Sequence, residues 1–73
     1  MSLKKGIYRH YKGNLYELID LATHSETLEK MVVYRALYGE QALWVRPMQM
    51  WEEEVNVDGK TVKRFTFLQD NRE

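Results

Sequence analysis

The sequence predicts a small all-β protein, an SH3-like barrel or roll of about five to six short antiparallel strands. Runs of alternating apolar and polar residues are separated by turn signals, and no run repeats with the period of a long helix. A chain of 73 residues has room for one modest core. Five Tyr, two Trp and two Phe must therefore supply much of its buried area.

The first two strands are predicted on either side of a tight turn. Gly6 opens a run that reaches residue 12, and Lys12-Gly13-Asn14 has turn chemistry. The second run, residues 15 to 22, carries apolar groups on both faces, so the alternation leaves its burial direction open.

The middle of the chain holds the clearest hairpin. Residues 31 to 38 and 42 to 46 read as strands joined by a short connection that begins at Gly39. Pro47 lacks an N–H donor and ends the second of them. A helical turn is predicted next, with Met48 and Trp51 one turn apart and directed at the core.

The last hairpin is centred on Asp58-Gly59, a strong two-residue turn signal. It joins residues 53 to 57 to residues 61 to 67, where Phe65 and Phe67 share a face that should be buried. We therefore expect one domain over residues 1–73, with its core at about 6–68 and flexible termini at 1–5 and 69–73.

Composition restricts the function. Eleven basic and eleven acidic residues give zero net charge, which disfavours non-specific nucleic-acid binding, although Lys4, Lys5, Arg9, His10 and Lys12 make a local basic group. The sequence has no cysteine, no signal-like segment and no apolar run long enough for a membrane. These features predict a cytoplasmic monomer or weak homodimer without membrane contact.

One loop contains groups capable of chemistry, namely His24, Ser25 and Glu26. Neighbouring side chains point in different directions, whereas a catalytic triad needs its base within about 3 Å of the nucleophile and an orienting group behind the base. Side-chain to backbone bonds from Ser25 or Thr27 are the favoured interpretation. His10, His24 and Glu26 lack a diagnostic zinc spacing, so we predict no catalytic residue, metal or cofactor.

Rings and guanidinium groups concentrate in the first and third strands, where alternate residues face opposite ways. If Val33 and Leu37 face the core, then Tyr34, Tyr38, Trp44 and Arg46 lie outside. The opposite arrangement buries Tyr34, Tyr38 and Trp44 and exposes Arg35. With Arg35 inside, Glu17 is a candidate partner. We favour the core arrangement, since so small a domain rarely leaves several rings exposed.

The two arrangements carry different functions. Exposed rings would make a surface for a peptide or protein partner, and flanking arginines would suit single-stranded nucleic acid. We expect a non-enzymatic binding module for a peptide or protein, with nucleic acid as the alternative and a His/Glu metal-dependent enzyme as a third class. The candidate binding surface comprises Tyr8, Arg9, His10, Tyr34, Arg35, Tyr38, Trp44 and Arg46.

An ordered series of motifs also carries a family resemblance. The motifs are Tyr8-Arg9-His10-Tyr11-Lys12-Gly13-Asn14, His24-Ser25-Glu26-Thr27, Val33-Tyr34-Arg35-Ala36-Leu37-Tyr38-Gly39, Leu43-Trp44-Val45-Arg46-Pro47 and Asp58-Gly59-Lys60 with Arg64-Phe65. Over roughly residues 6 to 68 the chain resembles the small bacterial domain-of-unknown-function family numbered 1653. The resemblance implies an SH3-like β-roll and implies no activity.

Overall fold

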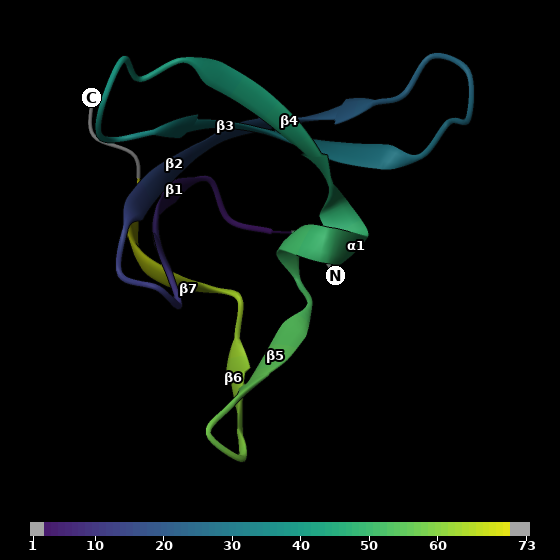
Figure 1. Cartoon of the computed structure of the whole chain (residues 1–73). Helices are drawn as coiled ribbons and strands as arrows, with labels where there is room; N and C mark the ends of the chain where they lie inside the picture. The colour runs from purple at the N-terminus through teal and green to yellow at the C-terminus, as the bar shows by residue number, and fades with distance from the viewer. Residues whose placement is uncertain (1–2, 71–73) are drawn as a thin grey trace.

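A five-stranded antiparallel sheet and a separate two-stranded hairpin make up the protein (Figure 1). The computed structural model describes residues 3–70, and the strand order of the larger sheet is β4-β3-β2-β1-β7. The elements are β1 (Gly6–His10), β2 (Leu15–Thr23), β3 (Lys30–Ala36), β4 (Leu43–Pro47), α1 (Met48–Trp51), β5 (Glu54–Val57), β6 (Lys60–Lys63) and β7 (Phe65–Asp70).

The all-β prediction and the helical turn after Pro47 are confirmed. The sheet curls without closing, so β4 and β7 remain as its two edges rather than meeting in a barrel (Figure 1). The last predicted strand is divided into β6 and β7 at Arg64, so residues 3–70 contain seven strands. Arg64 donates its N–H to the Glu53 carbonyl at 2.9 Å, and its own carbonyl accepts from Tyr11 at 2.9 Å. The chain therefore turns there from the hairpin into the sheet.

Turn chemistry sets the hairpin ends. Asp58 and Gly59 both have positive φ, at 52° and 80°, which is the geometry of a two-residue turn matched to the strand twist. The Asn56 side-chain carbonyl accepts the Gly59 N–H at 3.1 Å and fixes the turn. In the first hairpin Gly13 has φ 109° and donates its N–H to the His10 carbonyl at 2.7 Å.

The buried face of β3 is the one that carries Tyr34, and not the one that carries Val33. Val32, Tyr34 and Ala36 are buried, so the core arrangement is confirmed for Tyr34. The core cluster is largely aromatic and draws on α1 as well as on four strands; it consists of Tyr8, Leu18, Val32, Tyr34, Trp51 and Phe65. Met48 and Phe67 pack against it, as predicted for the helical turn and the last strand.

Two rings expected inside lie outside instead. Tyr34 pairs with Trp44 across the β3–β4 ladder, so both start on the same side of the sheet. Trp44 is nevertheless 58% exposed, because β4 is an edge strand. Tyr38 lies beyond the end of β3 and is 48% exposed. The expectation that Tyr34, Tyr38 and Trp44 would be buried together is wrong for the last two.

Pairing and packing extend beyond residues 6–68 at both ends. Asp70 in β7 pairs with Gly6 in β1, and Leu3 packs against the core. The Tyr8 hydroxyl donates to the Lys4 carbonyl at 2.6 Å. The flexibility predicted for residues 1, 2 and 71 to 73 lies outside the described residues. Within residues 3–70, no helix is long and apolar enough to cross a membrane.

Candidate functional site

The predicted binding residues are divided by the sheet into separate groups. Tyr8 and Tyr34 belong to the core and are removed from any surface. Arg35 lies on the opposite face from Tyr34, directly across from Glu17 on one side and Leu43 on the other. His10 and Arg9 reach a pocket near the first turn. The eight candidate residues therefore do not form one continuous surface.

The exposed edge of the sheet makes the first candidate site. Leu43, Trp44 and Val45 are consecutive residues of β4 and are 57%, 58% and 61% exposed. Trp44 and Tyr38 border a groove of about 270 Å³ at the end of the β3–β4 hairpin. We call Tyr38, Leu43, Trp44 and Val45 the edge patch. α1 contacts β4, but it follows Pro47 and leaves Trp44 uncovered.

The edge patch is joined to the core by two phenols. The Tyr16 and Tyr38 hydroxyls are 2.7 Å apart, and their rings meet edge to face with centroids at 5.7 Å. Tyr16 in turn packs edge to face on Tyr34 and Phe65. Tyr38 is thus held in position although it is about half exposed.

Tyr16 should ionise at a higher pH in the folded protein than in the unfolded chain. Burial, followed by the hydrogen bond and the charge of Tyr38, raises the pKa of Tyr16 to about 12 from an ordinary 10.0. Because the folded pKa is the higher one, this stabilisation is complete below pH 10 and is lost as the pH rises toward 12. We expect Tyr38→Phe to lower the Tyr16 pKa, measured by NMR of ring-labelled tyrosine. Equal Tyr16 pKa values in native and urea-unfolded protein would contradict the raised pKa, and an unchanged Tyr16 pKa in Tyr38→Phe would contradict the contribution of Tyr38.

Arg46 lies beside the core rather than in the edge patch. Its guanidinium carbon is 5.8 Å from the Tyr34 ring centroid and 5.6 Å from that of Phe65. These distances are those of cation–π contacts, so Arg46 covers the aromatic core. Within residues 3–70 its Nε atom is buried without a hydrogen-bond partner.

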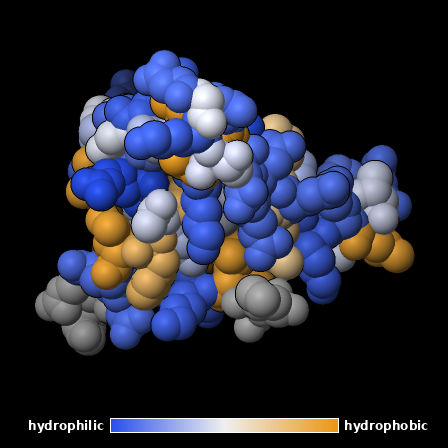
Figure 2. All heavy atoms as spheres, turned by 90° about the horizontal axis from the view of Figure 1, so that it is seen from below, coloured by the Kyte–Doolittle hydropathy of each residue, from blue (hydrophilic) through white to orange (hydrophobic). Residues whose placement is uncertain are grey.

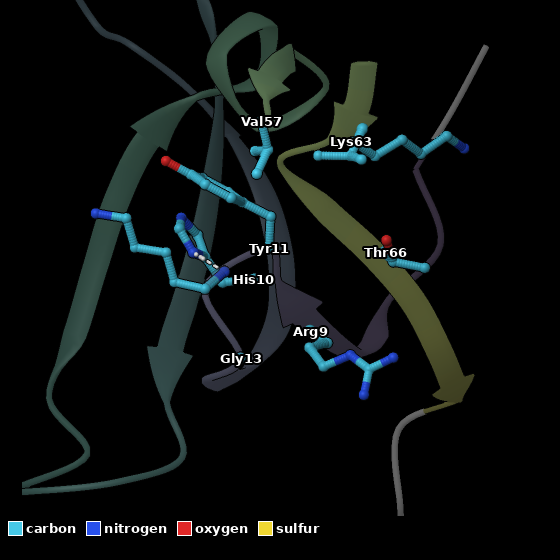
Figure 3. A pocket seen from close by; sticks show the side chains of 9 residues that line it. Arg9, His10, Tyr11, Gly13, Val57, Lys63 and Thr66 are labelled. Carbon is cyan, nitrogen blue, oxygen red and sulfur yellow. Dashed lines mark hydrogen bonds between the residues drawn. The ribbon is translucent and has the colours of Figure 1, made fainter. Parts of the chain in front are cut away.

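A second candidate site lies where the β1–β2 turn meets the β5–β6 hairpin. Figure 3 shows Tyr11 and Val57 on one side of this pocket and Thr66 on the other, with Arg9 below. The His10 ring packs beside Tyr11 with centroids 4.6 Å apart. His10 Nδ1 accepts the Lys12 N–H at 3.1 Å (Figure 3). Burial and the charges of Arg46, Arg64 and Lys12 lower the pKa of His10.

The loop candidates have a structural role. His24 Nδ1 accepts the N–H groups of Glu26 and Thr27 at 3.2 and 3.3 Å, and Thr27 Oγ1 accepts the Glu29 N–H at 3.2 Å. The prediction of side-chain to backbone bonds is confirmed for Thr27, while His24 rather than Ser25 makes the others. Within the described part of the chain, no three His, Asp or Glu side chains converge as metal ligands would.

The loop forms the tip of a projecting arm. Figure 2 shows a mainly hydrophilic face with hydrophobic atoms at the end of this β2–β3 arm, where Leu28 is 71% exposed.

Sequence reasoning missed several residues of the second site. The pocket is also lined by residues from the C-terminal part of the chain, namely Val57, Val62, Lys63 and Thr66. The Asp58-Gly59 signal located their hairpin, but only the Tyr11 to Arg64 hydrogen bond shows where the hairpin meets the first turn.

These features define a class: a small, open all-β domain with an aromatic core and two candidate surface sites. The chain belongs to the family described as "Protein of unknown function (DUF1653)", whose model matches residues 6–67. It is also similar to the crystal structure of a protein of that family from Bordetella bronchiseptica, with 32% identity and a TM-score of 0.86. The similarity covers 99% of this chain and 95% of that one. No curated protein matches the chain.

Proposed function

We propose that the protein is a non-enzymatic binding module that takes an extended peptide segment of a protein partner along β4. The observation that carries this proposal is the edge patch, where three consecutive strand residues are each more than half exposed. An edge strand leaves alternate N–H and C=O groups unpaired, and an extended peptide can bond to them as a further strand.

The chemistry of β4 favours an apolar partner segment. Side chains alternate across the strand, so an added strand would place residues beside Trp44 on one face and beside Leu43 and Val45 on the other. Natural edge strands are usually protected by charge, and β4 carries only Arg46 and ends at Pro47. The opposite edge, β7, is more polar, with Thr66, Gln69 and Asp70 exposed.

Truncation of Trp44 should weaken binding strongly without unfolding the protein. Short peptides are selected from a random library on the native protein, and their affinity is then measured for Trp44→Ala by isothermal titration calorimetry. We expect the variant to bind at least about tenfold more weakly, because a large apolar contact is removed. Its free energy of unfolding should change by less than about 1 kcal/mol, since the ring is 58% exposed.

Two controls make the test specific. Leu68→Ala removes a 43% exposed side chain from the other edge strand and should leave affinity unchanged. A selected peptide with N-methylated backbone amides should lose affinity, because it cannot donate to β4. Equal affinity of Trp44→Ala and native protein would overturn the proposal. It would also fail if β4 only pairs with a second copy, seen as a concentration-dependent dimer that Trp44→Ala dissociates.

The nucleic-acid alternative receives less support at this edge. Zero net charge gives no long-range attraction to a phosphate backbone. The basic residues that such binding would use are also dispersed, since Arg35 lies on the outer face, Arg46 over the core, and Arg9, His10 and Lys12 at the pocket.

A further inference from the structure

The pocket near the first turn is a second candidate ligand site, separate from β4. Its volume is about 480 Å³, within the range of roughly 300–1,000 Å³ usual for small-molecule sites. We call it the basic pocket; its lining consists of Arg9, His10, Tyr11, Lys12, Gly13, Val57, Val62, Lys63 and Thr66. These residues come from β1, the β1–β2 turn, β5, β6 and β7.

The charge of the lining has one sign. Arg9, Lys12 and Lys63 reach the basic pocket from three different parts of the fold, and no Asp or Glu is among the lining residues. Within residues 3–70 the ion pairs are Lys5 with Asp20 and Arg64 with Glu53, so the three cations of the pocket have no carboxylate partner. The lining therefore carries three cations and no carboxylate, and the nearest acidic residue in the ladder is Glu54, which stands opposite Lys63 in the β5–β6 pair.

Side chains, and not the backbone, must hold a ligand there. The N–H groups of His10, Tyr11 and Gly13 donate to carbonyl oxygens, and that of Lys12 donates to His10 Nδ1. Lysine carries its charge on a flexible stem and binds phosphate as a point charge, and Arg9 can add planar donors. Thr66 pairs with Arg9 across the β1–β7 ladder and offers a hydroxyl beside it.

The pocket also has an apolar wall. Val57 and Val62 come from the hairpin, and Tyr11 lines the same pocket as Val57 (Figure 3). Lys12 Nζ lies 5.9 Å from the Tyr11 ring centroid, so cation and ring are adjacent. The depressed pKa of His10, caused first by burial and then by Arg46, Arg64 and Lys12, agrees with a positive potential at this end of the sheet.

We propose that the basic pocket binds the phosphate group of a small organic phosphate, whose ring or apolar body packs against Tyr11, Val57 and Val62. A phosphate monoester carries more negative charge than a carboxylate, so it suits a lining with three cations better. Arg9 and Lys63 point away from each other in Figure 3, so these flexible side chains must turn toward a bound phosphate. The wall explains why the ligand should carry more than phosphate alone, because burying apolar surface adds affinity that a bare anion cannot gain.

The test is an NMR titration of the ¹⁵N-labelled full chain with three probes: adenosine 5′-monophosphate, adenosine and inorganic phosphate. We expect saturable shifts of the Lys12, Gly13, Lys63 and Thr66 amides with the mononucleotide, and at least about tenfold weaker binding of adenosine. If inorganic phosphate binds as tightly as the mononucleotide, the proposed packing of an organic body against the apolar wall is overturned, but the phosphate site is retained. Adenosine binding as tightly, or no saturable shift at these amides, would overturn the whole proposal.

Charge-removing variants locate the site. Lys12→Gln and Lys63→Gln should each weaken mononucleotide binding roughly threefold or more. Lys30→Gln is the matched control, because Lys30 is an exposed lysine outside the basic pocket, at the start of β3. Equal losses in all three variants would mean unspecific attraction and overturn the assignment. Peptide affinity at β4 should be unchanged in Lys12→Gln and Lys63→Gln, which keeps this result separate from the proposed peptide function.

Discussion

Trp51→Ala should remove most of the protein's free energy of unfolding. Trp51 is 1% exposed, stacks on Phe65 with ring centroids 3.7 Å apart and planes 3° apart, and meets the rings of Tyr8 and Tyr34. Removing such a ring costs about 3–5 kcal/mol. The net stability of a domain is only about 5–15 kcal/mol, and small domains lie at the lower end. Urea denaturation followed by circular dichroism measures the loss.

Two variants control for side effects of that change. The Trp51 Nε1 atom is buried and has no hydrogen-bond partner within the described residues, so Trp51→Phe removes apolar area but no hydrogen bond. We expect it to lose less than half as much stability as Trp51→Ala. Trp44→Ala deletes the same side chain from an exposed site and should leave the midpoint nearly unchanged. Similar midpoints for Trp51→Ala and Trp44→Ala would contradict the burial of Trp51.

Gly6→Ala should be the second most damaging change. Gly6 has φ 149°, and a methyl group there would collide with the Gln69 carbonyl oxygen and lie 3.0 Å from Phe67 Cε1 and 3.1 Å from Asp70 Cα. These atoms belong to β7, so the methyl group would push β1 and β7 apart. We expect a loss of about 2–4 kcal/mol, in the range of backbone strain added to overpacking. The measurement is again urea denaturation.

Gly39 provides the matched comparison. It also has positive φ, at 62°, but a methyl group there would meet nothing within 4 Å. Gly39→Ala therefore carries only the conformational cost, about 1 kcal/mol. If both variants lost the same stability, crowding against β7 would not be the reason for glycine at position 6.

Local signals in the sequence were sufficient for the hairpins and the core rings. Asp58-Gly59 adopts the expected turn, and Phe65 is buried as its spacing with Phe67 predicted. Pro47 ends β4 and α1 follows directly. Each of these features depends on neighbouring residues, which is why it can be read without the fold.

Features that depend on strand order could not be read in this way. Alternation places Trp44 and Tyr34 on one side of the sheet, yet one ring is exposed and the other buried. The difference arises because β3 has neighbours on both sides whereas β4 has β3 alone. Edge position is set by the whole sheet, and no local pattern around Trp44 reports it.

The candidate sites were only partly predictable for the same reason. Arg9, His10 and Lys12 stand out in the sequence as a basic group. Lys63 joins them in the basic pocket because the chain returns after the hairpin and β7 pairs with β1. That convergence joins residues far apart along the chain, and a single sequence contains no signal for it.

The pairing of β1 with β7 also bears on the order of events in folding. The β1–β2, β2–β3, β3–β4 and β5–β6 pairs join neighbouring segments and can close quickly. The ladder from Gly6 to Asp70 instead requires the two ends of the chain to meet, which carries the largest loop-closure entropy. This ladder is therefore the step on which the folding rate should depend, and the basic pocket, which spans it, is completed only when that step is over.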